Sequence, residues 1–369
     1  MTRTTRLSLL AFASLTIAVG SAVAATRPAG TAGNPLQVSM VPLTGAEAGQ
    51  FLGSLNFTMT NTSKQSVHVL KYQTPFFGIE NNLFEMYRGG ERVQYTGMYA
   101  KRTTPDAEDY MTFAPGETKR IAVDLSDNYD MSVSGQYQVK FQTVLQNADV
   151  GGRAMAKAGG GMATLESSQI NVWVDGSDMF MGPDTQAKRL SAEETVFGVK
   201  AAPAPVFEKC TTTQQSQVQT AFNASKTYAT NAKGYFPNQG LRYTTWFGVY
   251  DSSRHTTVKN HFTAIDAAYQ TQGFTFNCGC KKRYYAYVYS NDAYRIYLCS
   301  VFWQAPVTGT DSRAGTIVHE TSHFSVVAGT DDWAYGQSAA KSLAISSPAK
   351  AVDNADSHEY FAENTPSQN

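Results

Sequence analysis

The chain has 369 residues, of which 42% are hydrophobic, 12% aromatic and 16% charged. This composition is typical of a packed globular protein and excludes a largely disordered chain. With 30 basic and 30 acidic residues and a pI near 7.0, the protein has no global positive field, so we do not expect nucleic acid as a partner. The length favours two domains.

Residues 1–24 have the pattern of a secretory signal peptide. Arg3 and Arg6 precede an apolar run over residues 7–19, and small residues end the segment at Ala24. This run is too short to span a bilayer, and no later stretch has 18 uninterrupted apolar residues. We therefore expect a secreted, monomeric protein with no membrane partner.

The sequence of residues 36–174 predicts β-structure. Its short alternating runs cover residues 36–41, 55–59, 67–72, 121–125, 137–144 and 170–174. The turn before Tyr137 resembles the tyrosine corner of an immunoglobulin-like sandwich. Residues 151–161 are rich in glycine and predict a loop, because glycine loses much backbone entropy in a helix or strand. We predict an immunoglobulin-like β-sandwich and linker over residues 25–200.

A proline-rich segment at residues 201–205 marks the domain boundary, and the pattern of residues 201–369 is mainly helical. One amphipathic helix includes Val218 and Phe222. A second has Val258, Phe262, Ile265 and Tyr269 at helical spacing, residues 285–289 and 294–299 predict a tyrosine-rich hairpin, and residues 314–327 and 353–364 predict two further helices. The whole chain is therefore predicted to be α+β, with a mainly helical second domain and a small hairpin or sheet.

All four cysteines lie in this second domain, at Cys210, Cys278, Cys280 and Cys299. In an exported chain an even number of cysteines predicts disulfides, here two. One glycine separates Cys278 from Cys280, which makes a bond between them strained, so each is expected to pair with Cys210 or Cys299. A cysteine metal site is disfavoured because the usual two-residue spacing is missing.

The segment His319-Glu320-Thr321-Ser322-His323 places two imidazoles on one face of a helix, where both can reach one tetrahedral Zn²⁺ ion. Glu320 then faces the open coordination position. The alternative is a surface helix with two hydrated histidines. The apolar neighbours Ile317 and Val318 argue against it.

A third ligand is needed, and residues 329–336 read Gly-Thr-Asp-Asp-Trp-Ala-Tyr-Gly. This stretch resembles the aspzincin (deuterolysin-type) metallopeptidases, in which an aspartate after the turn completes the zinc site. The resemblance assigns that role to Asp332, whereas spacing alone leaves Asp331 open. By the same resemblance Tyr335 stabilises the developing oxyanion. Its alternative reading is a buried aromatic residue with an ordinary hydrogen bond.

Residues 243–248, 252–255, 308–312 and 354–361 resemble the peptidyl-Lys metalloendopeptidase branch of that group. The resemblance covers residues 210–369 and implies disulfides between Cys210 and Cys278 and between Cys280 and Cys299. It also implies that the N-terminal half is a propeptide.

Asp356 and Glu359 stand at i and i+3, so on a helix their carboxylates share a face and can bind one ammonium group. A lysine side chain fits this pair better than the bulkier guanidinium of arginine. The resemblance makes the same assignment, with cleavage on the amino side of lysine. The alternative is that Asp356 caps a helix and Glu359 is solvated.

These observations predict a secreted zinc endopeptidase, made as a zymogen, that acts on lysine-containing proteins and peptides. Zinc-bound water attacks the peptide bond and Glu320 accepts its proton. The propeptide is expected to act as an inhibitor or folding chaperone, and the tyrosine-rich hairpin to hold substrate in extended form. Val199–Lys200 and Glu208–Lys209 are candidate self-processing bonds, and Lys281–Arg283 is interpreted as a solvated strand edge.

Two alternatives are kept. One is a deuterolysin-like endopeptidase of broader specificity. The other is a secreted binding protein whose zinc domain is inactive, which is disfavoured because Glu320 and Tyr335 are both present.

Overall fold

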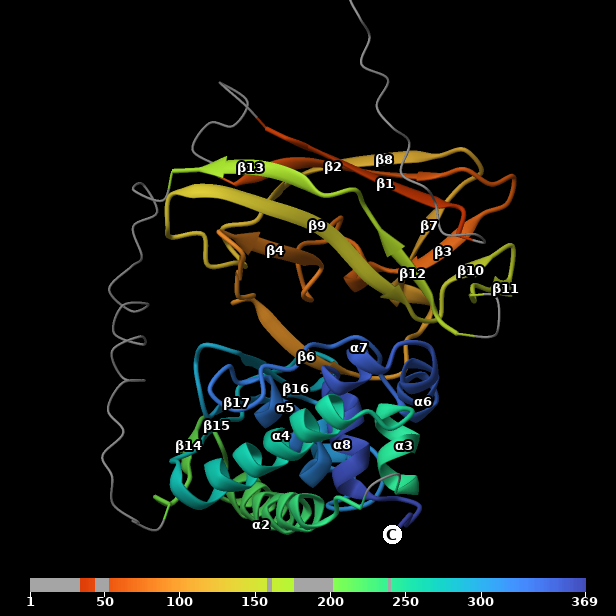
Figure 1. The fold of residues 1–369 in the computed structure, drawn as a ribbon. Coiled ribbons are helices and arrows are strands. Elements are labelled where there is room, and N and C mark those ends of the chain that lie inside the picture. Colours follow the sequence, from red (N-terminus) through yellow and green to blue (C-terminus); the bar gives the residue numbers. More distant parts are fainter. Residues whose placement is uncertain (1–33, 44–52, 158–160, 176–201, 238–239) are drawn as a thin grey trace, which may run out of the picture.

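The computed structural model describes residues 34–43, 53–157, 161–175, 202–237 and 240–369 (Figure 1). The predicted signal peptide, most of the predicted linker and the Val199–Lys200 bond lie outside these residues. Figure 1 shows a β-sheet region stacked on a mainly helical region. Among the described residues, no helix combines the length and apolar character needed to cross a membrane.

The N-terminal region consists of strands with two short 3₁₀ turns, η2 (Lys71–Gln73) and η3 (Ala107–Asp109). Its strands are β1 (Leu36–Pro42), β2 (Ser54–Asn61), β3 (Val67–Leu70), β4 (Phe84–Arg88), β5 (Glu91–Arg92), β6 (Met98–Arg102), β7 (Tyr110–Phe113), β8 (Thr118–Asp124), β9 (Gly135–Leu145), β10 (Asp149–Val150), β11 (Arg153–Ala154), β12 (Ala163–Glu166) and β13 (Ile170–Val174). The six predicted runs correspond to β1, β2, β3, β8, β9 and β13, although the run 67–72 is a strand only to Leu70 and then enters η2. Strands β4, β5, β6, β7, β10, β11 and β12 were not predicted.

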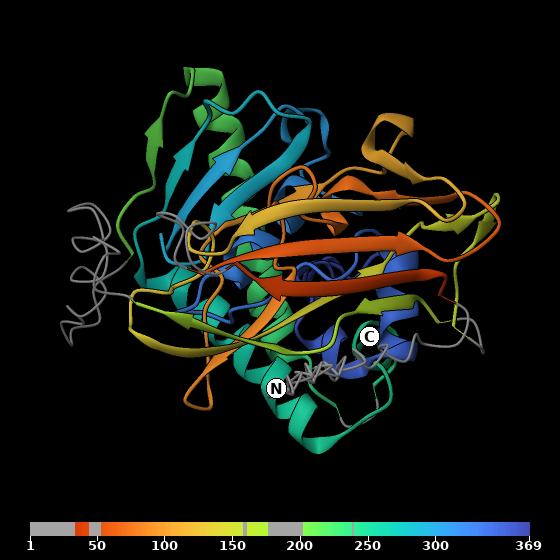
Figure 2. The same cartoon turned by 90° about the horizontal axis from the view of Figure 1, so that it is seen from above.

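These strands form layers around one apolar core. The sheet β1-β2-β8 lies over the sheet β12-β9-β4-β5, in which β13 also pairs with β9 (Figure 2). A third sheet, β11-β10-β3-β7, closes one side. Phe57 of β2 packs edge-to-face on Phe141 of β9 and Phe84 of β4, with ring centroids 4.9 and 6.4 Å apart. Burial of such facing apolar side chains holds the two layers together.

The Tyr137 hydroxyl donates a hydrogen bond of 2.7 Å to the carbonyl of Val133, which is the contact expected of a tyrosine corner. The immunoglobulin-like class of the sandwich stays a prediction. The predicted loop over residues 151–161 is wrong at its start. Gly151 and Gly152 have φ of 56° and 79° and form the tight turn of the β10–β11 hairpin, a conformation that glycine adopts without steric cost.

The C-terminal region contains helices α2 (Thr212–Gly234), α3 (Leu241–Phe247), α4 (Ser252–Thr271), α5 (Arg313–His323), α6 (Gln337–Ser346), α7 (Pro348–Val352) and α8 (Ala355–Glu363), the 3₁₀ turn η5 (Phe302–Gln304), and strands β14 (Val206–Glu208), β15 (Thr275–Asn277), β16 (Tyr284–Tyr289) and β17 (Arg295–Leu298). The predicted helices correspond to α2, α4, α5 and α8, and the hairpin to β16 and β17. Helix α5 ends at His323, before the predicted end at residue 327, because Phe324 is extended with ψ of 128°. The short helices α3, α6 and α7 were not predicted.

The sheet of this region has the order β14-β15-β17-β16-β6, so its last strand comes from the N-terminal region. Figure 1 shows β6 reaching down from the β-sheets to the helical half. It runs antiparallel to β16, with Lys101 opposite Ala286 and Ala100 opposite Tyr287. The two regions therefore share a continuous sheet.

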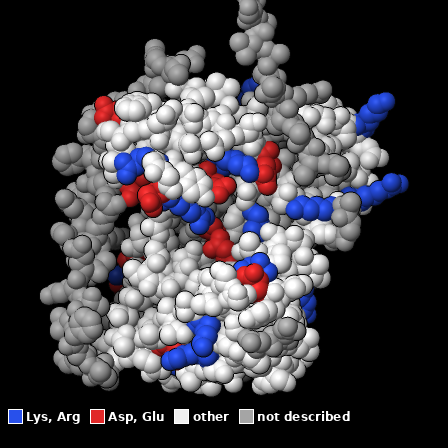
Figure 3. All heavy atoms as spheres, viewed as in Figure 1, with Lys and Arg blue, Asp and Glu red and all other residues white. Residues whose placement is uncertain are grey.

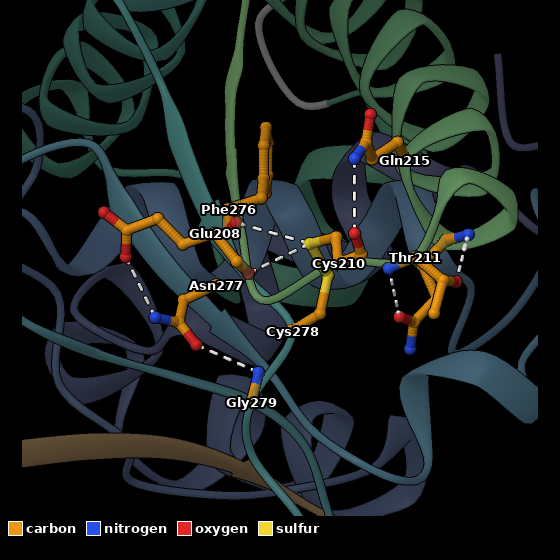
Figure 4. Close-up of a disulfide and its surroundings, with 9 residues drawn as sticks. Glu208, Cys210, Thr211, Gln215, Phe276, Asn277, Cys278 and Gly279 are labelled. Carbon is orange, nitrogen blue, oxygen red and sulfur yellow. Dashed lines mark hydrogen bonds between the residues drawn. A yellow bond between two sulfur atoms is a disulfide. The ribbon is translucent and has the colours of Figure 1, made fainter.

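Two disulfides join Cys210 to Cys278 and Cys280 to Cys299, the pairing that the family resemblance implies. The first ties the end of β14 to the end of β15 at the start of α2 (Figure 4). There the Thr211 hydroxyl accepts a hydrogen bond from the backbone N–H of Gln214, and the Gln214 side chain bonds back to Thr211. This capping box and the disulfide fix where α2 begins.

Loop length predicts how much each disulfide stabilises the domain. The Cys210–Cys278 bond closes a separation of 68 residues and the Cys280–Cys299 bond one of 19. Chain entropy predicts a loss of about 4 kcal/mol in the free energy of unfolding for Cys210→Ser/Cys278→Ser and about 3 kcal/mol for Cys280→Ser/Cys299→Ser. Urea unfolding of Glu320→Gln protein, followed by tryptophan fluorescence, measures both. A larger loss for the shorter loop would contradict the entropic account.

Candidate metal centre and the pocket beside it

Helix α5 carries the centre and is buried from Ala314 to His323. Its N-cap is Ser312, whose hydroxyl accepts a hydrogen bond of 2.9 Å from the backbone N–H of Gly315. A Cβ at Gly315 would lie 2.1 Å from Glu363 Oε1, so glycine here permits α8 to approach α5 closely. The helix thus presents His319 and His323, one turn apart, toward α8 and toward the loop that follows α5.

Three side-chain atoms converge on one point. His319 Nε2 and His323 Nε2 lie 3.2 Å apart, and Asp332 Oδ1 lies 3.3 and 3.4 Å from them. Tetrahedral ligands at about 2.0–2.1 Å from zinc are separated by about 3.3–3.4 Å from one another. Neither carboxylate oxygen of Asp332 accepts a hydrogen bond from a described residue, although the side chain is fully buried. The three ligand atoms therefore fit a zinc ion.

Oxygen atoms behind the imidazoles contact both rings. His323 Nδ1 is hydrogen-bonded to the carbonyl oxygen of Thr330 at 2.7 Å, and His319 Nδ1 lies 2.8 Å from Asp356 Oδ1 as an ion-pair contact. Each contact favours the proton on Nδ1 and leaves the Nε2 lone pair for a metal. Gly329, with φ of 61°, reverses the chain after α5 and returns Thr330 to this position.

The loop that carries Asp332 is held against α8 by Asn354. The Asn354 side-chain oxygen accepts hydrogen bonds of 2.9 Å from the backbone N–H groups of Trp333 and Ala334. The backbone N–H of Asp331 donates to the carbonyl of Asp353 at 2.8 Å. Sequence reasoning missed Asn354, although it opens the stretch 354–361 that carries the resemblance.

Asp331 and Asp332 project to different surroundings, as adjacent residues of an extended segment do. The Asp331 carboxylate accepts hydrogen bonds from Tyr99 Oη at 2.5 Å, Asn82 Nδ2 at 2.8 Å and Arg92 Nη2 at 2.9 Å. These three partners belong to the N-terminal region. Of the two aspartates that spacing left open, Asp332 lies with the imidazoles and Asp331 binds the N-terminal region.

Burial and charge set the protonation of the acidic groups. Burial raises the pKa of Glu320 to about 7, against the opposing effect of His319 and His323. A carboxyl group with a pKa near neutrality is suited to accept and return a proton at physiological pH. Burial would also raise the pKa of Asp332, but the two imidazoles lower it well below its ordinary value.

A second group of acidic side chains lies beside His319. Asp356 and Glu359 of α8 are both buried, and Asn354 rather than Asp356 is the N-cap of the helix. The solvated arrangement considered as an alternative is therefore wrong. Lys101 Nζ from β6 lies between these acids, 2.7 Å from Glu359 Oε2 and 3.5 Å from Asp356 Oδ1.

Asp311 is a third acid of this pocket, which sequence reasoning missed. Its Oδ1 lies 3.2 Å from Lys101 Nζ and accepts a hydrogen bond of 2.7 Å from Tyr360 Oη. The sequence feature that could have identified Asp311 is its position in residues 308–312, a stretch that carries the family resemblance, one residue before the N-cap of α5. Burial would lower the pKa of Lys101, but Asp356 and Glu359 raise it well above its ordinary value, so the amine is an ammonium ion.

Tyr335 is buried beside Asp332. Burial raises the pKa of its hydroxyl well above the ordinary value, and the charge of Asp332 raises it further. Its backbone pairs with the side chain of Gln146, the residue after β9: the Tyr335 N–H donates to Gln146 Oε1 at 2.8 Å, and the Tyr335 carbonyl accepts from Gln146 Nε2 at 2.6 Å. The hydroxyl therefore stays protonated and can donate a hydrogen bond.

Lys281, Lys282 and Arg283 are exposed, as predicted for a solvated segment, but the strand that follows them is not a free edge. Arg283 forms ion pairs with Asp106 and, at 2.9 Å, with Asp109 of the N-terminal region. The adjacent strand β16 is already paired with β6. On the face shown in Figure 3, positive and negative side chains lie side by side across the middle of the molecule.

Two imidazoles and a carboxylate around one point, with the glutamate of a His-Glu-x-x-His helix beside them, define a metallopeptidase centre. The aspzincin M35 family model, described as lysine-specific metallo-endopeptidase, matches residues 232–363. An extracellular protease of Aeromonas hydrophila is 43% identical over 324 residues, 85% of this chain and 89% of that protein. The chain belongs to the aspzincin M35 family and is a zinc metalloendopeptidase.

Two further relatives differ in what their names say. A peptidyl-Lys metalloendopeptidase of Armillaria mellea is 33% identical over 343 residues, 88% of this chain and 92% of that protein. A neutral protease 2 homolog of Phaeosphaeria nodorum is 26% identical over 338 residues, 87% of this chain and 90% of that protein.

The contrast between the two neighbouring aspartates gives a direct test of the metal centre. Asp332→Asn should weaken zinc binding by about 100-fold or more, because it removes one ligand of the three. Asp331→Asn should leave zinc affinity within about twofold, since its carboxylate faces Asn82, Arg92 and Tyr99. Competition with a chelator measures both. Equal losses in the two variants would contradict the assignment.

Proposed function

We propose that this protein is a secreted zymogen whose zinc endopeptidase domain cleaves peptide bonds on the amino side of lysine. The observation that carries the proposal is the ammonium group of Lys101, which lies buried between Asp356 and Glu359 beside His319. The names of the family and of the Armillaria relative support the same substrate class. The Aeromonas relative is named an extracellular protease, which supports secretion.

The proposed zinc ligands are His319, His323 and Asp332. When bound, zinc supplies a Lewis acid that polarises the peptide carbonyl and acidifies water. Glu320 accepts the proton of the attacking water and returns it to the leaving amine. We assign to Tyr335 the hydrogen bond that stabilises the negative charge developing on the carbonyl oxygen, for which its protonated hydroxyl is suited.

The size and charge of the pocket favour lysine over arginine. Three carboxylates, from Asp311, Asp356 and Glu359, surround one compact ammonium group that can donate three hydrogen bonds. A guanidinium group is larger and planar and needs two parallel acceptors in a wider site. Neutral side chains would leave the buried carboxylates without a positive partner, at a cost of several kcal/mol.

The proposed side of cleavage follows from the contacts of Tyr99 and Lys101. Tyr99 stacks on the imidazole of His323, and Lys101 lies in the acidic pocket beside His319, so the Ala100–Lys101 bond lies between the two contacts. A substrate held in the same way would be cleaved before its lysine.

A broader specificity is the second candidate, because the Phaeosphaeria relative is named a neutral protease 2 homolog. Mapping the new N-termini in a digest of a denatured protein separates the two proposals. Cleavage before lysine alone supports the first. Cleavage before many residue types, unchanged by Glu359→Gln, supports the second.

Substitutions of the acidic residues in the pocket should reduce the preference for lysine to different degrees. Glu359→Gln should lower kcat/KM for a peptide with lysine after the cleaved bond by about 100-fold, because a fully buried ion pair is lost. Asp311→Asn should lower it by about tenfold or less, since 38% of the Asp311 side chain is exposed and solvent screens its charge. Peptides that differ only in having Lys, Arg or Gln after the cleaved bond give the ratios of kcat/KM among these three residues. The zinc content of each variant is measured alongside. An unchanged Lys/Gln ratio in Glu359→Gln would contradict the assignment.

Maturation is proposed to occur by self-cleavage near the linker. Glu208–Lys209 lies at the end of β14, on the edge of the sheet opposite to β6, so a molecule cannot present this bond to its own centre in the described fold. Glu320→Gln protein secreted from a protease-free host should remain uncut, whereas the wild type is cut before lysine. N-terminal sequencing of both secreted proteins shows whether each was cut and at which bond. Identical trimming of both proteins would show that another protease acts.

A further inference from the structure

Strand β6 lies where an extended substrate is expected. It adds to the edge of β16 in antiparallel register, with Ala100 opposite Tyr287 and Tyr99 opposite Val288. Strand addition of this kind binds a peptide through its backbone, whatever its side chains. The tyrosine-rich hairpin predicted to hold substrate thus holds a segment of the N-terminal region of the same chain.

The side chains of β6 reach both parts of the active site. The ring of Tyr99 stacks on the imidazole of His323, with centroids 4.4 Å apart and planes at 11°. Two residues later Lys101 enters the acidic pocket, where its side chain is only 1% exposed. Ala100 lies between them and is itself buried. Arg102 follows and covers the rings of Tyr72 and Tyr284 at 4.3 and 4.8 Å.

The Ala100–Lys101 peptide bond is therefore next to the catalytic groups. Lys101 occupies the proposed lysine pocket, 2.7 Å from Glu359 Oε2, and β6 packs against α5, the helix that carries Glu320. On the other side of Ala100, Tyr99 stacks on the imidazole of His323, a proposed metal ligand. A substrate cleaved before lysine would place its scissile bond in this same position.

We propose that β6 is a substrate-like inhibitory strand, which blocks the enzyme by placing Lys101 in the pocket that selects lysine and Ala100–Lys101 at the position of the scissile bond. This inference rests on the proposed lysine specificity. It explains why a buried lysine, rather than an apolar residue, stands at position 101. The N-terminal region thus binds the acidic pocket through a lysine side chain, the feature that the proposed substrates share.

The rest of the N-terminal region holds the strand in place. Asn82 and Arg92 bind Asp331 together with Tyr99 of β6 itself, and Gln146 binds the backbone of Tyr335. Because these contacts come from residues before and after β6 in the chain, a free peptide must compete with an intramolecular partner of high effective concentration. Cutting the linker alone would leave these contacts intact, so activation requires that the N-terminal region dissociates or is degraded.

The test compares intact chains that differ at one lysine. Wild-type, Lys101→Met and Lys140→Met zymogens are assayed on a peptide with one lysine, before and after limited digestion that removes the N-terminal region. Lys140→Met is the matched control, because Lys140 also forms an ion pair, 2.6 Å from Glu166, but on the surface of the same region. Lys101→Met should raise the activity of the intact chain by about tenfold or more, and Lys140→Met should not change it.

The outcomes separate this inference from the proposed function. If fully activated wild type does not cleave before lysine, the proposed function fails. If it does, but intact Lys101→Met is as latent as wild type, the inhibitory strand fails. Binding of a labelled lysine peptide to intact Glu320→Gln and Glu320→Gln/Lys101→Met chains gives a readout without catalysis, with tighter binding expected for the double variant. Should Lys101→Met not fold, Lys101→Arg replaces it and should also raise intact-chain activity, whereas unchanged latency would overturn the proposal.

Discussion

The active site is organised by the need to neutralise buried negative charge. Glu320, Asp332, Asp356 and Glu359 are all buried within one small volume. Burying an ion without a partner costs several kcal/mol even after the protein relaxes, so such a cluster requires positive charge. Two cations can supply it: a metal ion between the imidazoles and Asp332, and an ammonium group between Asp356 and Glu359. In the proposed function the first provides the chemistry and the second the specificity, and both follow from the same electrostatic constraint.

Asp356 joins these two functions. One of its oxygens lies 2.8 Å from His319 Nδ1 and 3.5 Å from Lys101 Nζ, and the other accepts a hydrogen bond of 2.6 Å from the Gly336 N–H. The carboxylate thus contacts both His319 and Lys101 and anchors the loop after Asp332. If the pocket receives the lysine of a substrate, as proposed, this one side chain would link recognition of the substrate to the alignment of the catalytic groups.

Much of the architecture was predictable because it depends on local periodicity. Alternating runs identified β1, β2, β3, β8, β9 and β13, and helical spacing identified α2, α4, α5 and α8. Strand β6 was not predicted because its central residues, Tyr99, Ala100 and Lys101, show no alternation of apolar and polar side chains. All three are buried by contacts with both regions. Asn354 and Asp311 were missed for a related reason: each acts through partners on other elements, and neither belongs to a repeating pattern.

The amino-acid sequence alone determined the chemistry of this protein: a pair of histidines one helical turn apart, a glutamate between them and acidic residues on one face of a later helix. These are short-range relations, encoded by the geometry of a single helix or turn. Only the tertiary structure decided which of two adjacent aspartates meets the imidazoles and which lysine fills the acidic pocket. Lys101 and Asp356 are 255 residues apart, and no local pattern specifies such a contact, because it exists only when two domains pack together.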